Sequence, residues 1–86
     1  MHQIPMPQVD VGLLEQVTNQ DDRRSFVGNA VYPQILSILG EAYAGKITGM
    51  IIDESAVDIK RLLLDQGYLN QQVNDAYYML LNAHQQ

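Results

Sequence analysis

Residues 41–53 have the sequence EAYAGKITGMIID, from which the prediction of the fold starts. Its large apolar residues Tyr43, Ile47, Met50 and Ile51 are separated by four, three and one positions. In a helix with 3.6 residues per turn, this spacing places all four side chains on one side. The pattern therefore predicts a helix over residues 41–53 with one apolar face.

Two glycines interrupt this predicted helix. Gly45 and Gly49 stand four positions apart and so share a face, although a glycine inside a helix costs about 1 kcal/mol relative to alanine. In one interpretation, the glycines let a second helix cross closely. In the other, they leave a slot in which an aromatic ring of a partner rests on exposed backbone. Their spacing alone leaves both interpretations open.

Helical periodicity continues on both sides of this segment. Upstream, Asp10 is a candidate cap for a helix over residues 10–17. A capping-box-like sequence at residues 18–21 opens a helix over residues 19–39, which Gly40 ends.

Downstream, residues 55–58 repeat the capping pattern and predict a helix over residues 55–64. A last helix over residues 68–84 follows, and no stretch alternates with a period of two. The predicted fold class is therefore all-α, a small bundle of four to five helices. The apolar stripe of the last helix consists of Leu69, Val73, Ala76, Tyr77 and Leu80.

Residues 1–8 differ from the rest of the chain. Pro5 and Pro7 disfavour a helix there and favour extended backbone. We expect residues 1–8 to form a flexible tail or linker and residues 9–86 to form the helical domain.

Composition excludes several classes of function. The 86 residues contain no cysteine, so the chain has no disulfide framework and no thiolate metal site. A net charge of -5 with only five Lys and Arg argues against nucleic-acid and anionic membrane surfaces. No apolar run approaches the roughly 20 residues of a transmembrane helix, and no signal peptide is evident. We expect a cytoplasmic protein that contacts neither nucleic acid nor membrane.

The catalytic inventory is poor. His2 and His84 lie near the two ends of the chain and lack neighbours at metal-ligand spacing. The adjacent carboxylates at residues 21–22 and 53–54 are explained as helix caps and helix ends. The sequence therefore predicts no enzyme, no metal site and no cofactor.

The last predicted helix has apolar side chains outside its core stripe. Tyr78, Met79 and Leu81 extend its apolar surface to a second face. Exposed apolar patches mark partner sites, and methionine suits adaptable binding surfaces. A contact between two copies of the chain, through Tyr78 and Leu81, is the alternative.

Several motifs resemble one known family. Residues 44–50 (AGKITGM) are similar to the signature Lys-Ile-Thr-Gly-Met-Leu-Leu-Glu of the MLLE family, the C-terminal domain of poly(A)-binding proteins. Residues 28–33 (GNAVYP) resemble the family's Gly-Glu-x-Leu-Tyr/Phe-Pro. Residues 73–76 (VNDA) and 83–85 (AHQ) resemble its Val-Asp-Glu-Ala and Ala-His-Gln. The resemblance covers residues 18–86.

The resemblance implies a right-handed helical bundle that binds short linear motifs of the PABP-interacting type, found in disordered regions of factors for mRNA translation, decay or transport. A Phe of the motif would insert between the second and third helices, and a Leu between the third and the last. The first pocket would be lined by Asn29, Tyr32, Gly45, Lys46, Thr48 and Ile51, with Gly49 beside it. The second would be lined by Met50, Ile52, Val73, Ala76 and Tyr77, with His84 at its edge.

The chain departs from the family pattern at several positions. Ile51, Ile52 and Asp53 replace Leu-Leu-Glu, and Asn29 replaces a glutamate. An alternative is thus a divergent copy from another RNA-binding protein, such as a fungal mRNA-transport protein, or from a HECT-type ubiquitin ligase. Such a copy would bind motifs weakly or not at all and serve as an accessory or self-association domain. Since the domain is acidic, we expect it to prefer neutral or basic motif peptides.

Overall fold

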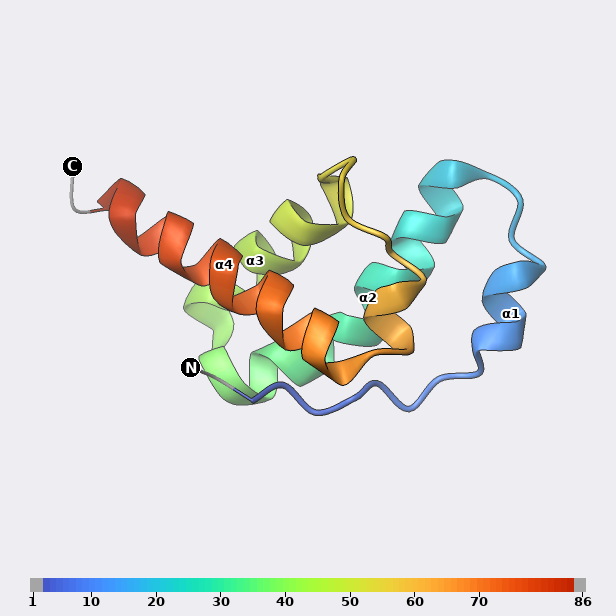
Figure 1. Cartoon of the computed structure of the whole chain (residues 1–86), viewed down its shortest axis with the longest axis horizontal. Helices are drawn as coiled ribbons and strands as arrows, with labels where there is room; N and C mark the ends of the chain where they lie inside the picture. Colours follow the sequence, from blue (N-terminus) through green and yellow to red (C-terminus); the bar gives the residue numbers. More distant parts are fainter. Residues whose placement is uncertain (1–2, 85–86) are drawn as a thin grey trace.

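The computed structural model of the chain describes residues 3–84. Its elements are α1 (Val11–Glu15), α2 (Gln20–Leu39), α3 (Glu41–Asp53), the 3-10 helix η1 (Arg61–Leu63) and α4 (Gln66–His84) (Figure 1). The described part of the chain contains no strand, so the prediction of an all-α fold is confirmed.

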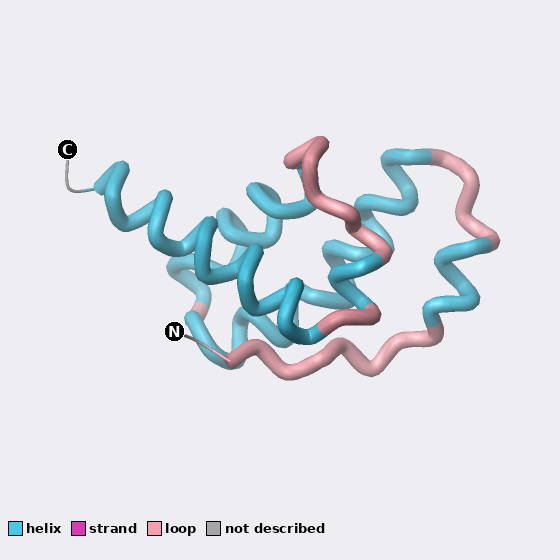
Figure 2. Tube along the Cα trace, in the orientation of Figure 1, coloured by secondary structure: helices cyan, strands magenta, loops and turns pink. Residues whose placement is uncertain are grey.

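The third helix, α3, lies between the two longest helices. It packs against α2 on one side and against α4 on the other, whereas η1 packs against α4 and α2. The domain measures 42 × 22 × 20 Å along its principal axes. Figure 2 shows the non-helical N-terminal segment running along one side of the bundle. Both flanks of α3 are therefore junctions between helices.

Each element contributes apolar side chains to one core. Helix α3 presents a stripe at steps of three and four residues, as its sequence predicts. Helix α4 does the same with Leu69, Val73 and Ala76, while Tyr77 and Leu80 of its predicted stripe are partly buried. The other buried apolar residues are Ile4, Leu14, Val27, Val31, Ile35, Ala44, Ile47, Ile51, Leu62 and Leu63.

Helix α2 begins one residue later than the capping-box reading expected. Asn19, not Thr18, is the N-cap, and its side-chain oxygen accepts hydrogen bonds from the backbone N–H groups of Asp21 and Asp22. The helix continues through Pro33 and ends at Gly40, whose φ of 81° is the one positive value in the described backbone. That conformation favours glycine, and it lets α3 start immediately in a new direction.

The predicted helix over residues 55–64 is wrong. Only Arg61–Leu63 are helical, as a single 3-10 turn. The N-cap of this turn is Lys60. Asp58 accepts a hydrogen bond from the Arg61 N–H, and the Asp58 N–H donates to the Tyr68 hydroxyl at 2.9 Å. In the predicted capping box the same Asp58 N–H would donate to the Ser55 side chain, so the hydrogen bond to α4 takes the place of that cap.

The N-terminal segment of residues 3–9, which we call the strap, is extended as the prolines predict. It nevertheless packs on the bundle, although we expected a flexible tail or linker over residues 1–8. The Ile4 side chain is fully buried, and the Ile4 N–H donates to the Asn70 side chain at 2.6 Å. Gln66 and Gln34 donate side-chain N–H groups to the Ile4 and Met6 carbonyls. The strap thus fills a gap between α2 and α4 and satisfies its polar backbone there.

Replacing Ile4 by alanine tests whether the strap belongs to the folded domain. We expect Ile4→Ala to lower the free energy of unfolding by about 2–4 kcal/mol, because it leaves a cavity in the core. Urea unfolding followed by circular dichroism measures this change. Ile38→Ala is the matched control, since Ile38 is 42% exposed on α2, and it should change stability by less than about 1 kcal/mol. Equal effects of the two variants contradict the packing of the strap.

Asp65 links η1 to the first turn of α4 and makes stability depend on pH. The backbone N–H of Tyr68, followed by the Arg61 side chain, lowers the Asp65 pKa below its usual 3.8. A carboxylate whose pKa is lower in the folded state stabilises the fold above its unfolded pKa, and this contribution is lost as pH falls through the folded value.

We therefore expect the melting temperature to fall below about pH 4, and Asp65→Asn to remove part of that fall. Asparagine keeps the oxygen that accepts from the Tyr68 N–H but does not titrate. Thermal melts between neutral and strongly acidic pH measure the effect. A variant whose pH profile superimposes on that of the parent chain excludes a role for Asp65.

Candidate functional site

The structure distinguishes the two interpretations of the α3 glycines. A Cβ atom built on Gly45 or Gly49 meets no other atom within 4 Å beyond its own helical turn. No neighbouring helix crosses at either position, so the helix-crossing interpretation is wrong. The two glycines instead leave bare backbone on the outer surface of α3, where Gly45 is exposed and Gly49 is partly exposed.

The close approach of α2 to α3 occurs at Gly28. A Cβ atom there would lie 3.0 Å from Ile52 Cδ1 and 3.7 Å from Thr48 Cγ2. Gly28 is buried, so the absent side chain is what lets Thr48 and Ile52 pack against α2. The Thr48 hydroxyl is buried in this junction and has no hydrogen-bond partner among the described residues.

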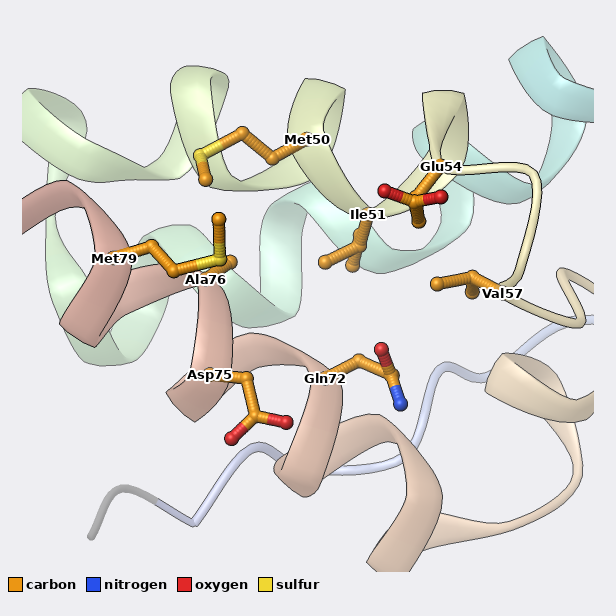
Figure 3. Close-up of a pocket in the computed structure, with 8 residues that line it drawn as sticks. All are labelled: Met50, Ile51, Glu54, Val57, Gln72, Asp75, Ala76 and Met79. Atoms are coloured by element: carbon orange, nitrogen blue, oxygen red, sulfur yellow. The ribbon is translucent and has the colours of Figure 1, made fainter.

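A groove lies at the other junction, between α3 and α4. It encloses about 230 Å³, which is smaller than the 300–1,000 Å³ typical of cofactor and drug sites and suits an individual apolar side chain. Figure 3 shows Met50 and Met79 at one end of the groove and Glu54 and Val57 at the other. The groove is lined by Met50, Ile51, Glu54, Val57, Gln72, Asp75, Ala76 and Met79.

The residues expected to hold a Leu anchor divide among several places. Met50 and Ala76 line the groove. Val73 is fully buried in the core and does not line the groove. Tyr77 packs edge-on against Tyr43, with ring centroids 5.3 Å apart, and so holds α4 on α3. Ile52 lies on the opposite flank of α3, against Gly28.

The residues expected to hold a Phe anchor are also divided. Ile51 lines the α3–α4 groove, because its position is one turn beyond Ile47 on the buried stripe. Tyr32 and Lys46 are exposed. Asn29 lines a second groove, between α2 and the strap, with Gln8, Val9, Phe26, Ala30, Pro33 and Gln34. The side chain of His84 and all of His2 lie outside the described residues.

Sequence reasoning missed four residues that line the α3–α4 groove: Glu54, Val57, Gln72 and Asp75. Met79 was expected only as part of an exposed apolar surface on the last helix. The sequence did contain a pattern that links three of the groove residues, because Gln72, Asp75 and Met79 recur at steps of three and four and so share one face of α4. The helix predicted over residues 55–64 included Val57. Because that helix does not form, the position of Val57 beside the groove was not expected. The exposed apolar surface expected on α4 is present, with Tyr78 51% and Met79 64% exposed.

Most of the cations serve contacts within the domain. Arg23 donates to the Leu14 and Val17 carbonyls at the end of α1. Arg24 pairs with Asp21, Lys60 with Glu15, and Arg61 with Asp65. Among residues 3–84, Lys46 is thus the cation for which no such contact is found. No basic surface is assembled in the described part of the chain.

The described residues hold neither a cluster of metal ligands nor a helix that could span a membrane. Within residues 3–84, no group of three or more His, Asp or Glu side chains is arranged to hold a metal ion. No helix found there is long and apolar enough to cross a membrane. The arrangement that remains is a small groove beside a central helix with two bare glycines.

This fold and site define a class: small all-α domains whose central helix lies beside a largely apolar groove. The chain belongs to the MLLE domain family, whose model matches residues 13–80. Domains of this family are non-catalytic and generally bind peptides in PABP-like proteins. The match ends before the Ala-His-Gln sequence at residues 83–85. No solved structure matches the chain.

Alanine substitutions at Gly45 and Gly28 test this assignment of the glycines. We expect Gly45→Ala to raise the free energy of unfolding by about 0.5–1 kcal/mol, because alanine favours the helix and its methyl group meets open space. We expect Gly28→Ala to raise the free energy of unfolding by less than Gly45→Ala does, because Ile52 must move to make room for the methyl group. Denaturant titrations of both variants measure the difference. A Gly45→Ala variant less stable than the parent chain contradicts the open slot.

Proposed function

We propose that this domain binds short linear motifs with Phe and Leu anchors, carried by partners in mRNA translation, decay or transport. The observation that carries the proposal is the α3–α4 groove, whose floor is Ile51 and Ala76 and whose rim includes the exposed Met79. A groove of this size beside a bare helix surface suits an extended peptide with separate anchors. With partners of this kind, we expect the domain to act in the cytoplasm.

The bare backbone at Gly45 and Gly49 supports a second anchor position. An aromatic ring stacks closely on a helix only where no Cβ intervenes, and this condition holds at both glycines. Lys46 lies between them in the sequence and is exposed. In this proposal, the Phe anchor rests on this surface while the Leu anchor enters the groove on the other flank of α3.

The alternative is a divergent copy that has lost motif binding and serves as an accessory or self-association domain. Ile51 is nearly fully buried in the groove floor, and β-branched residues there make the floor stiffer than leucine would. Self-association would use Tyr78, which is 51% exposed and does not line the groove. The two functions therefore depend on different residues of the same helix.

Calorimetric titration with a synthetic peptide that carries Phe and Leu anchors tests the proposal. We expect saturable binding that disappears when both anchors are replaced by alanine. Gly45→Leu should abolish binding without loss of melting temperature, because its side chain occupies the slot and not the core. Met79→Ala should weaken binding by about fivefold, the equivalent of roughly 1 kcal/mol of lost apolar contact.

Tyr78→Ala is the matched control for Met79→Ala, since the two residues are adjacent, apolar and exposed. It should leave peptide affinity unchanged. Sedimentation velocity on the same variants tests the alternative. A parent chain that dimerises, becomes monomeric with Tyr78→Ala and fails to bind the peptide favours self-association over motif binding.

A further inference from the structure

The α3–α4 groove combines an apolar interior with two carboxylates. Glu54 follows the C-terminal end of α3 and Asp75 lies on α4, so the two acidic side chains come from opposite sides of the groove (Figure 3). Both residues are exposed. An apolar side chain entering between Met50 and Met79 therefore shares the groove with two acidic residues, Asp75 on α4 and Glu54 at the other end (Figure 3).

Among the described residues, no cation forms an ion pair with either carboxylate. The ion pairs found within residues 3–84 join Arg24 to Asp21, Lys60 to Glu15 and Arg61 to Asp65. One oxygen of Glu54 accepts a hydrogen bond from the Ala56 N–H, which is a neutral donor. Lys46 does not line the groove. The rim thus keeps its negative charge in a domain whose formal net charge is already -5.

We infer that the groove selects an apolar anchor, leucine or methionine, that is flanked in its peptide by lysine or arginine. This inference rests on the proposed function and adds to it a partner chemistry: a basic linear motif. The anchor enters the space between Met50, Ile51 and Ala76. The flanking cations reach Glu54 on one side and Asp75 on the other.

The chemistry of the lining suits such a ligand. Lysine and arginine have apolar stems that pack along methionine side chains while the charged heads remain in water at the rim. Methionine adapts its shape to leucine or to another methionine, so the groove tolerates either anchor. Glutamate flanks would instead place like charges beside Glu54 and Asp75, which disfavours both encounter and binding.

The test uses two synthetic peptides with identical Phe and Leu anchors. Lysine flanks the Leu in one, and glutamate flanks it in the other. At about 0.15 M salt we expect the lysine peptide to bind at least about fivefold tighter, as two exposed ion pairs permit. At about 1 M salt the gap should shrink, because the affinity of the lysine peptide falls while that of the glutamate peptide rises.

Two charge-matched double variants locate the effect. Glu54→Gln with Asp75→Asn should remove most of the preference, and glutamine still offers an oxygen to the Ala56 N–H. Asp22→Asn with Glu41→Gln changes the net charge equally, at exposed positions away from the groove. This control should retain the preference. Melting temperatures establish that both variants fold.

The outcomes separate this inference from the proposed function. If both peptides bind equally well to the parent chain, the domain binds motifs but the acidic rim does not select them. If the control variant loses the preference as fully as the groove variant, the overall charge is responsible and the groove assignment is wrong. If neither peptide binds, the proposed function itself fails and this inference with it.

Discussion

The packing of α3 between α2 and α4 is the constraint on which the rest of the structure depends. One stripe of α3 is buried, and its central residues Ala44, Ile47 and Ile51 hold the helix in the core. A helix buried along one stripe has two flanks, and here each flank is a junction with a long helix. The α2 junction is closed at Gly28, whereas the α4 junction stays open as a groove. Both features that we assign to ligand binding are consequences of this position.

The distribution of charge follows from how small the domain is. A chain of 86 residues with one core needs polar contacts to hold its short elements in place. Arg23 caps the end of α1, and Lys60 and Arg61 tie the η1 region to Glu15 and Asp65. Arg61 also stacks on the Tyr68 ring at 4.3 Å. Four of the five cations make these contacts or pair with Asp21, and no ion pair found within residues 3–84 involves Glu54 or Asp75 at the α3–α4 groove.

The candidate site shows where sequence reasoning succeeds and where it stops. The AGKITGM motif led to α3, to its glycines and to Met50, all of which lie at or beside the surface proposed for binding. It did not lead to Glu54, which belongs to no motif, or to Asp75, which belongs to the separate VNDA motif. Both residues matter only through what lies across the groove. The family resemblance implied that Ile51 lines a pocket between α2 and α3. It lines the groove between α3 and α4 instead, because it belongs to the buried stripe of α3.

Helix periodicity, capping residues and glycine positions in the sequence determined the all-α class and located the three long helices to within about two residues. These are local properties, because backbone hydrogen bonds and the burial of one helical face act over a few neighbouring positions. Tertiary structure alone decided the rest. The Asp58 N–H donates to the Tyr68 hydroxyl instead of to a Ser55 cap, and the Ile4 N–H donates to the Asn70 side chain across 66 positions of sequence. The groove, too, exists only where α3 meets α4, because a pocket is a property of the space between elements. The steps of three and four among Gln72, Asp75 and Met79 define one face of α4 but not the helix that lies across from it.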